Sequence, residues 1–271
     1  MRTTEKDSLY NDLEQMTSEE ILRGINAEDR TVPEAVGRII PLITKLVDGI
    51  VERMGRGGRV FYLGAGTSGR LGVTDASEIP PTYGVYDRFI GIIAGGDSAL
   101  RNAVEGAEDD PGQGWKDILA FRPTSEDTLV GITASGGAPY VLGAIRKAGK
   151  AGLLTACITC NDESPVVDAC EIPLVAVVGP EFVTGSTRMK SGTAAKLILN
   201  MISTAVMIRT GHVSGNKMVD MQLTNSKLVD RGTRMIMEKT GLDDYQKARD
   251  LLLRCGSVRK AVAEYQHSAG N

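Results

Sequence analysis

The sequence predicts an α/β protein: a three-layer α-β-α sandwich around a five-stranded parallel sheet, with helical additions at both ends. Two observations lead to this prediction. Short runs of apolar, β-branched and aromatic residues leave no polar face, which is typical of strands buried on both sides. Helix-like segments separate these runs, and helical crossovers between apolar strands build a doubly wound sheet. At 271 residues, with 42 % apolar residues, the chain is long enough to bury such a core.

The expected strands and helices alternate along the middle of the chain. Strands are expected at 59–63, 89–94, 128–133, 153–159 and 172–178. Helices are expected near 70–77, 98–109, 138–149 and 163–169, because each begins or ends at Gly, Pro or a small polar residue. In such a sheet, ligands bind outside the carboxyl ends of the strands.

Residues 1–54 are predicted to form a helical N-terminal arm. Apolar residues recur at helical spacing from Val36 to Met54, which predicts one long amphipathic helix that packs on the core or on a partner subunit. Two capping boxes precede it, each pairing a threonine with a glutamate three residues later. The two boxes are Thr17 with Glu20, and Thr31 with Glu34.

The C-terminal part begins with a stretch at 191–210 that is apolar nearly all round, so we expect a helix buried on several sides. Two short helices are expected at 243–253 and 257–266. The chain is therefore predicted to have three parts. These are the arm at 1–54, a core at 55–220 that contains the sheet, and a helical cap at 221–271.

Composition excludes several classes of function. The net charge is −3 and aromatic residues make up only 4 %, which argues against a general nucleic-acid binder. The N-terminus is charged and lacks an apolar signal core, and Asn200 interrupts the longest apolar helix. We therefore expect a soluble cytoplasmic protein without a membrane segment.

A glycine-rich loop directly follows the first predicted strand. Gly64, Gly66 and Gly69 allow close approach of the backbone, while Thr67 and Ser68 add hydroxyl donors. The N–H groups at the start of the next helix favour an anion such as phosphate. The same spacing fits a dinucleotide fingerprint, but side chains within the loop suit a terminal phosphate better than a bridging pyrophosphate.

Two further loops rich in small and hydroxyl residues follow later strands. One contains Ser135 and Gly136, and the other runs from Thr184 to Lys190. Because the carboxyl ends of parallel strands meet at one edge, the three loops together predict a phosphate site. The alternative is that they are only tight turns between strands and helices.

Two groups of carboxylates lie near these loops. Glu78 precedes Pro80 and Pro81, which we expect to hold the chain extended at the rim of the site. Glu105 and Glu108 are three residues apart, so a helix over 98–109 would place them on one face. Their alternative role is to solvate the end of that helix.

Cysteines offer little evidence of a metal or redox site. Cys157 and Cys160 form a CxxC, but the surrounding LLTACITC is typical of a buried strand, and no second pair completes a zinc site. Ordinary packing is the favoured interpretation, and no metal is expected.

Four long motifs occur in order across about residues 8–265. They are GAGTSGRLGVTDASEIPPTYG, AVEGAEDD, VTGSTRMKSGTAAKLILNMIST and GNKMVDMQLTNSKL. Together they resemble the N-acetylmuramic acid 6-phosphate etherases, members of the sugar isomerase (SIS) fold group that also includes the glucokinase regulatory proteins. The resemblance implies a cytoplasmic homodimer that releases D-lactate from a phosphorylated amino sugar without a metal or organic cofactor.

The resemblance also implies roles for individual residues. Glu78 would protonate the departing lactate oxygen, and Glu108 would be the second catalytic carboxylate, the base at C2 of the sugar. Arg70 is a further candidate cation beside the strand-end loops. The residues implied to bind substrate are Thr67, Ser68, Gly69, Ser135, Gly136, Ser186, Thr187, Arg188 and Lys190.

The sequence differs from the family pattern in two places, which limits the roles that the resemblance implies for individual residues. Gly137 and Ala138 stand where relatives commonly have Arg-Thr, and the C-terminal helical segment is shorter than usual. Two other functions stay open: a non-catalytic sugar-phosphate regulator, and a phosphosugar isomerase.

Overall fold

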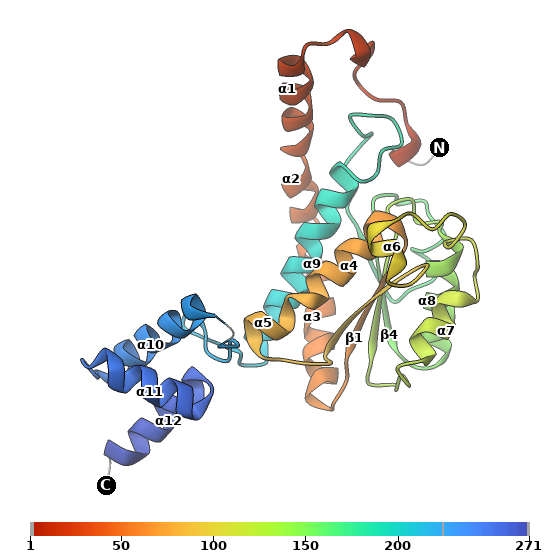
Figure 1. Ribbon diagram of the computed structural model, residues 1–271. Helices are drawn as coiled ribbons and strands as arrows, with labels where there is room; N and C mark the ends of the chain where they lie inside the picture. The colour runs from red at the N-terminus through yellow and green to blue at the C-terminus, as the bar shows by residue number, and fades with distance from the viewer. Residues whose placement is uncertain (1–2, 224, 270–271) are drawn as a thin grey trace. The chain divides into compact units, whose positions relative to one another are not determined.

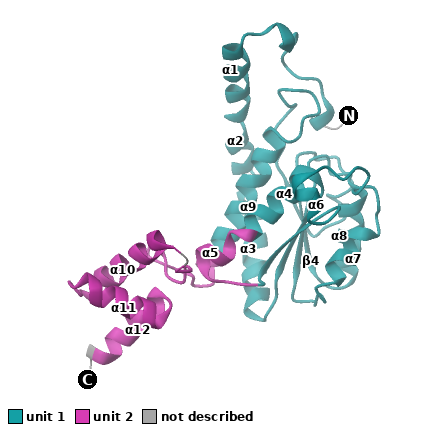
Figure 2. Cartoon of the chain, viewed as in Figure 1, with its two compact units in different colours: residues 1–76, 87–206 teal, residues 77–86, 207–271 magenta. Residues whose placement is uncertain are grey.

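The computed structural model describes residues 3–223 and 225–269, which form two compact units (Figure 2). The first unit comprises the residues up to Ala76 together with Asp87–Val206, and the second comprises Ser77–Tyr86 together with the residues from Met207 onward. The three-part division at 1–54, 55–220 and 221–271 follows the order of elements rather than these units, and it stays a prediction.

The first unit contains the predicted five-stranded parallel sheet, so the fold class is confirmed. Its strands are β1 (Val60–Gly64), β2 (Phe89–Ile93), β3 (Thr128–Ile132), β4 (Leu154–Thr159) and β5 (Ile172–Val175), in the order β2-β1-β3-β4-β5. β1 pairs in parallel with both β2 and β3, with Leu63 opposite Ile92 on one side and Gly131 on the other. The chain therefore leaves β1 in one direction and returns on its other side, which makes the carboxyl ends of β1 and β3 a topological switch point.

Helices cover both faces of the sheet (Figure 1). α7 (Gln113–Leu119) and α8 (Pro139–Lys150) lie on one face, and α3 (Ile40–Gly55), α4 (Gly66–Ser77) and α9 (Lys190–Arg209) on the other. Phe61 belongs to the apolar cluster under α8, whereas Tyr62 faces α4. A Cβ at Gly91 would lie 2.4 Å from the Cα of Val73, so only glycine lets α4 pack this closely on the sheet.

The N-terminal helices confirm one capping box and correct the other. The described part of the chain begins with two short 3₁₀ turns, Thr3–Glu5 and Leu13–Gln15, and α1 (Ser18–Asp29) follows them. Thr17 and Glu20 cap α1 reciprocally, as predicted. Thr31 forms no side-chain cap, because its hydroxyl instead donates to the carbonyl of Glu28 at 2.8 Å.

The long helix predicted between Val36 and Met54 is two helices, α2 (Val32–Gly37) and α3. The second starts with proline in its first turn, at Pro41. Since proline lacks an N–H and its ring obstructs a preceding helical turn, a continuous helix cannot pass this point.

Three further expectations are corrected. Residues 163–169 form turns rather than a helix, and the segment predicted at 98–109 is helical only in α6 (Ser98–Arg101). Gly106 has a φ of 71°, a left-handed conformation that interrupts a right-handed helix. In the second unit, the prolines after Glu78 do not extend the chain but start a short helix, α5 (Ile79–Tyr83), because proline fits the first helical turn.

The second unit also holds a three-helix cap with its own apolar core. Its helices are α10 (Ser226–Thr240), α11 (Tyr245–Cys255) and α12 (Val258–Ala269), and a small hairpin joins β6 (Val213–Ser214) and β7 (Lys217–Met218). α11 and α12 were predicted, whereas α10 was not. Met235 and Ile236 of α10 pack with Leu252 of α11 in the core.

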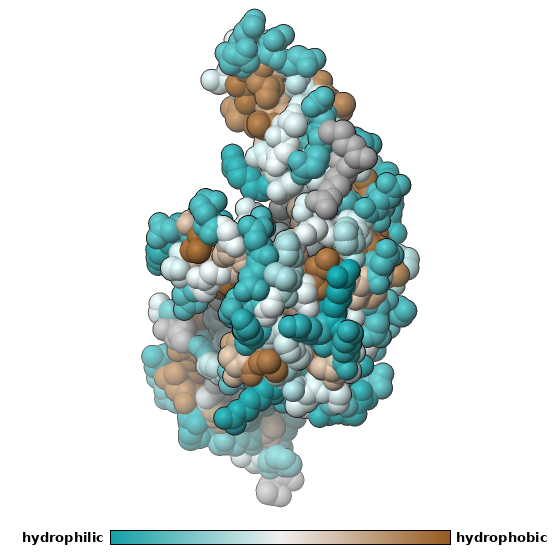
Figure 3. Space-filling model, turned by 90° about the vertical axis from the view of Figure 1, so that its right-hand side faces the viewer, coloured by the Kyte–Doolittle hydropathy of each residue, from teal (hydrophilic) through white to brown (hydrophobic). Residues whose placement is uncertain are grey.

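α9 is the one helix in the described part of the chain that is long and apolar enough to cross a membrane, with a mean hydropathy of 1.3. Over half of this apolar stretch, 56 %, is buried inside the protein, as expected for a core helix. Hydrophilic side chains cover most of the face seen in Figure 3, and hydrophobic ones form small separate groups there.

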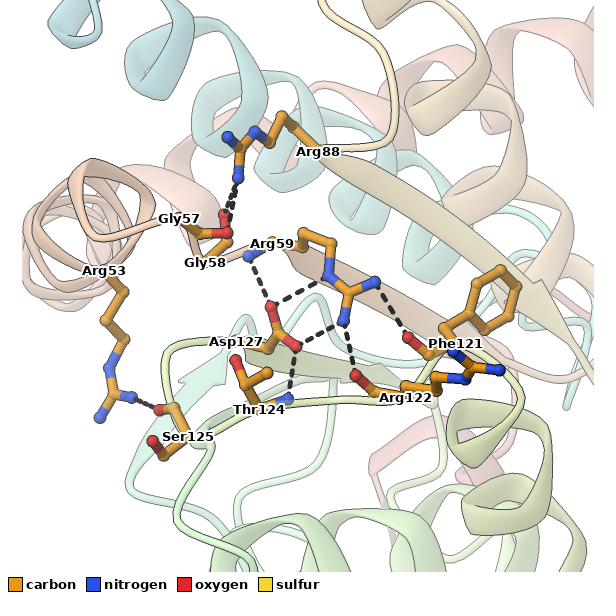
Figure 4. A network of polar contacts seen from close by, with 10 residues as sticks. All are labelled: Arg53, Gly57, Gly58, Arg59, Arg88, Phe121, Arg122, Thr124, Ser125 and Asp127. Carbon is orange, nitrogen blue, oxygen red and sulfur yellow. Dashed lines mark hydrogen bonds and ion pairs between the residues drawn. The ribbon is translucent and has the colours of Figure 1, made fainter.

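At the amino end of the sheet, Arg59 and Asp127 form the centre of a polar network (Figure 4). The backbone N–H, Nε and Nη2 of Arg59 all donate to the Asp127 carboxylate, at 2.8, 3.2 and 2.8 Å. The N–H of Thr124 adds a fourth bond at 2.8 Å. Burial raises the pKa of Asp127, but these hydrogen bonds outweigh it and hold the pKa below its ordinary value.

Candidate active site

A cavity of about 330 Å³ lies at the carboxyl ends of β1, β3 and β4, beside the first turns of α4 and α9. It belongs wholly to the first unit. Its lining combines small and apolar residues with residues that carry hydroxyl or carboxylate groups. The polar residues that line it are Glu5, Thr67, Ser68, Glu108, Thr133, Ser135, Thr159, Thr187 and Ser191.

The first glycine loop is shorter than the sequence suggested, because α4 already begins at Gly66. Thr67 and Ser68 therefore lie in the first turn of this helix, where backbone N–H groups lack intrahelical acceptors. Gly69 does not line the cavity; a Cβ there would lie 2.6 Å from the carbonyl oxygen of Gly64, so glycine closes the turn. The cavity thus receives the positive end of the α4 dipole.

In the second loop, as in the first, the hydroxyl residue lines the cavity and the glycine forms the turn. Ser135 lines the cavity, whereas Gly136 does not. Gly136 has a φ of 69°, and a Cβ there would lie 2.1 Å from the Oγ of Ser164. Gly136 is therefore required by the turn, and Ser135 is the residue of the two that lines the cavity.

In the third loop, Thr187 lines the cavity, while Ser186, Arg188 and Lys190 do not. The Lys190 side chain is only 3 % exposed, and its Nζ lies 2.6 Å from the carboxylate of Glu28. The charge of Lys190 is thus already paired, so the structure does not bring this predicted cation to the cavity.

Ser191, at the start of α9, lines the cavity although no local pattern in the sequence indicates it. Glu181 is buried and accepts hydrogen bonds from the N–H groups of Lys190 and Ser191, at 2.7 and 3.0 Å. It also accepts the Ser191 hydroxyl proton at 2.7 Å. An acidic side chain capping a helix from nine residues upstream leaves no local pattern to detect.

Glu5 is a second residue that the sequence did not reveal. Thr4 and Asn161 are both buried and bond reciprocally: Thr4 N–H donates to Asn161 Oδ1 at 3.1 Å, and Asn161 Nδ2 donates to Thr4 Oγ1 at 3.0 Å. Asn161 also donates to the carbonyl of Ala134 at 2.9 Å. This tether holds the N-terminal segment against the strand ends, so that Glu5 lines the cavity.

The two predicted catalytic glutamates have different positions. Glu108 lines the cavity, and its carbonyl accepts the N–H of Tyr140 at 2.9 Å. Glu105 and Glu108 do not share a helix face, because both lie in turns. Glu78 belongs to the second unit, where it directly precedes α5, and it is not among the residues that line the cavity.

A smaller cavity of about 200 Å³ adjoins the first, and the two share Ala65, Gly66 and Glu108. Arg70 and Glu105 line the smaller one. The Nε of Arg70 donates to the carbonyl of Leu100 at 3.1 Å.

A buried polar cluster connects the two helices whose first turns meet at the larger cavity. Asp75 of α4 accepts hydrogen bonds from Asn200 and Ser203 of α9, at 2.8 and 3.3 Å. Burial is the main cause that raises the pKa of Asp75, and these donors only partly offset it.

The cysteines pack as the sequence predicted. Cys157 lies in the core cluster under α8. Cys160 lines the larger cavity, but burial raises its pKa to about 11, so it is a neutral thiol near pH 7. Within residues 3–223 and 225–269, no group of three or more His, Cys, Asp or Glu is arranged to hold a metal ion.

Comparison with known proteins gives strong similarity along almost the whole chain. The chain is 58 % identical over 267 residues to the N-acetylmuramic acid 6-phosphate etherase of Bacteroides thetaiotaomicron, covering 98 % of this chain and 96 % of that relative. It is 59 % identical over 261 residues to the etherase of Porphyromonas gingivalis, covering 96 % and 95 %. A family model, the glucokinase regulatory protein N-terminal SIS domain, matches residues 42–149.

Solved structures share the fold at much lower identity. A phosphoheptose isomerase from Neisseria gonorrhoeae has a TM-score of 0.52 at 18 % identity, covering 70 % of this chain and 98 % of that chain. A proposed phosphosugar isomerase involved in capsule formation, from Bacteroides fragilis, has a TM-score of 0.53 at 21 % identity, covering 70 % of this chain and 91 % of that chain. These structures support the SIS fold alone.

Proposed function

Because this chain belongs to the N-acetylmuramic acid 6-phosphate etherases, a family of carbon–oxygen lyases, we propose that the cavity at the carboxyl ends of β1, β3 and β4 is its active site. There the enzyme cleaves the D-lactyl ether of N-acetylmuramic acid 6-phosphate, yielding N-acetylglucosamine 6-phosphate and D-lactate.

The observation that carries this assignment is the set of free donors in the larger cavity. The hydroxyls of Thr67, Ser68 and Thr187 make no hydrogen bond to the rest of the described chain, yet all three line the cavity. None of the described residues that line it is Lys or Arg. A phosphate here is bound by hydroxyls and by the N-terminal turn of α4, a mode that needs no cationic side chain.

Glu108, which lines both cavities, is the proposed base. In the open-chain form, the C1 aldehyde makes the C2 proton acidic, and the Glu108 carboxylate removes it. As the C3–O bond breaks, a carboxylic acid protonates the lactate oxygen, leaving a double bond between C2 and C3. Water then adds at C3 and a proton returns to C2, so the sugar product regains a hydroxyl. No metal or organic cofactor takes part in this scheme.

Glu78 is proposed as that carboxylic acid, on the family resemblance of the DASE motif. Glu5 is a carboxylate that the structure adds to the cavity, so it is the natural comparison for the role of Glu78. We further propose a cytoplasmic homodimer. Exposed apolar side chains on the N-terminal segment support an interface, with Leu9 70 % and Leu22 66 % exposed.

The assignment is tested by incubating the purified protein with N-acetylmuramic acid 6-phosphate in ¹⁸O-labelled water. Elimination followed by addition should place the label in the C3 hydroxyl of the sugar product and leave the released D-lactate unlabelled. Binding of phosphosugars without lactate release would favour a regulatory protein, and aldose–ketose interconversion would favour an isomerase.

Glu78→Gln tests the acid. We expect lactate release to fall at least about 100-fold, while affinity for the substrate stays within about tenfold, because the phosphate contacts remain. Glu163→Gln, an exposed carboxylate outside both cavities, is the matched control and should keep full activity. Full turnover by Glu78→Gln together with loss of turnover by Glu5→Gln would transfer the role to Glu5.

A further inference from the structure

The smaller cavity differs chemically from the larger one. Its walls are mostly small and apolar, and it contains the guanidinium of Arg70. At about 200 Å³ it has room for roughly seven water molecules, enough for a three-carbon acid but small for a hexose phosphate. The small apolar residues that line it are Ala65, Ala94, Ala99, Ala103, Val104 and Ala107.

Arg70 is held in place without being neutralised. It lies one turn into α4, and its Nε donates to the carbonyl of Leu100, which fixes the plane of the guanidinium. Arg70 forms no ion pair with any other described residue of the chain. Its two terminal nitrogens therefore remain available for a ligand, and a guanidinium binds a carboxylate through two parallel hydrogen bonds.

Glu108 connects the two cavities because it lines both of them. On the proposed function, this carboxylate acts at the sugar carbon next to the one that carries the lactyl ether. A substrate whose phosphate occupies the hydroxyl-lined cavity would direct that ether past Glu108 toward Arg70.

We propose, on the basis of the proposed function, that the smaller cavity is the lactyl subsite: Arg70 binds the lactyl carboxylate, and the alanine-rich wall receives the lactyl methyl group. Arg70 is then a specificity residue for the leaving group rather than a phosphate ligand. The sugar product, which keeps the phosphate and loses the lactyl group, does not engage it.

The test compares Arg70→Gln and Arg70→Lys with Arg101→Gln, an exposed arginine of α6 that lines neither cavity. Steady-state kinetics gives kcat/KM for the substrate, and calorimetry gives the Kd of N-acetylglucosamine 6-phosphate. For Arg70→Gln we expect kcat/KM to fall about 10- to 100-fold while the Kd of the sugar product changes less than twofold. Arg70→Lys should lie between, because lysine keeps the charge but loses the two-pronged geometry.

An equal loss of affinity for the sugar product would make Arg70 a phosphate ligand and overturn the proposal. Unchanged kinetics in Arg70→Gln, or the same loss in Arg101→Gln, would overturn it as well. If Arg70→Gln does not fold, the proposal is tested on the unaltered protein with a substrate whose lactyl carboxylate is replaced by an amide. The protein should turn over this amide about 10- to 100-fold less efficiently than the acid. Equal turnover of amide and acid would contradict the subsite. Lactate release by the unaltered protein tests the proposed function separately.

Discussion

The two ends of the central sheet differ in how far their polar groups are hydrogen-bonded within the protein. At the amino end, the Asp127 carboxylate accepts four hydrogen bonds. Each nitrogen of the Arg59 guanidinium donates at least one, since the guanidinium also donates to the carbonyls of Phe121 and Arg122 (Figure 4). At the carboxyl end, the hydroxyls of Thr67, Ser68 and Thr187 face a cavity without protein partners. The polar groups at the amino end are hydrogen-bonded within the protein, whereas the hydroxyls at the carboxyl end are available to the proposed ligand.

The largest expected effect is on catalysis at the carboxyl end. Glu108→Gln removes the proposed base without changing its size, so kcat should fall about 10²- to 10⁴-fold, as measured by D-lactate release. Stability should change little, because Glu108 is exposed and only its backbone carbonyl holds the turn to Tyr140. Asp109→Asn, an exposed neighbour that lines neither cavity, should retain full activity. Comparable losses in both variants would place the base elsewhere.

At the amino end, the same kind of change should act on stability instead. Asp127→Asn leaves Arg59 without its counter-charge and breaks the network, so unfolding in urea should show a loss of about 3 kcal/mol with normal kcat in the folded enzyme. The adjacent Glu126→Gln is the control. Glu126 forms an exposed pair with Arg56, at 2.6 Å, which should contribute less than about 1 kcal/mol.

The Asp127 network also predicts a pH dependence. Because the folded-state pKa of Asp127 is lowered, its contribution is present above the unfolded-state pKa near about 4 and is lost as the pH falls through the folded-state pKa. Asp127→Asn should therefore lose less stability than the unaltered protein on acidification below about pH 4. Parallel pH profiles would mean that this carboxylate is not held by Arg59 in solution.

The smallest effect is expected at Asp75, which lies between α4 and α9. Because burial raises the pKa of Asp75, its ionised form costs stability at neutral pH, and the cost disappears as the pH falls through the raised pKa toward the unfolded value. Asp75→Asn should remove this gain, so the free energy of unfolding of the variant should not rise as that of the unaltered protein does on acidification.

Urea unfolding at several pH values measures the Asp75 effect. Asp97→Asn, an exposed aspartate of the same unit, should leave the pH profile unchanged. A profile for Asp75→Asn that follows the unaltered protein at every pH would show that Asp75 does not titrate in this range.

The sheet and the strand-end loops could be predicted because their signals are local. Apolar runs without a polar face marked every strand of the sheet, and glycines and hydroxyls marked the loops that follow β1 and β3. Local signals were also present where predictions were wrong: Pro41 ends the first part of the long helix, and Gly106 prevents the helix proposed around Glu108.

The rest of the candidate site depends on contacts between distant residues. Thr4 and Asn161, which bring Glu5 to the cavity, are 157 residues apart. Lys190 looks like a free cation in the sequence, but Glu28, 162 residues away, pairs with it. No spacing rule relates such residues, because their proximity is a result of the whole fold.

The tether between Thr4 and Asn161 allows enzyme engineering to act on one wall of the proposed active site. Asn161 is 1 % exposed and touches no catalytic carboxylate, yet it holds the segment that carries Glu5. Replacing Asn161 removes its hydrogen bonds to Thr4 and to the carbonyl of Ala134, so it should loosen both the N-terminal segment and the loop that follows β3. Libraries that seek turnover of bulkier muramyl compounds can start from this buried position.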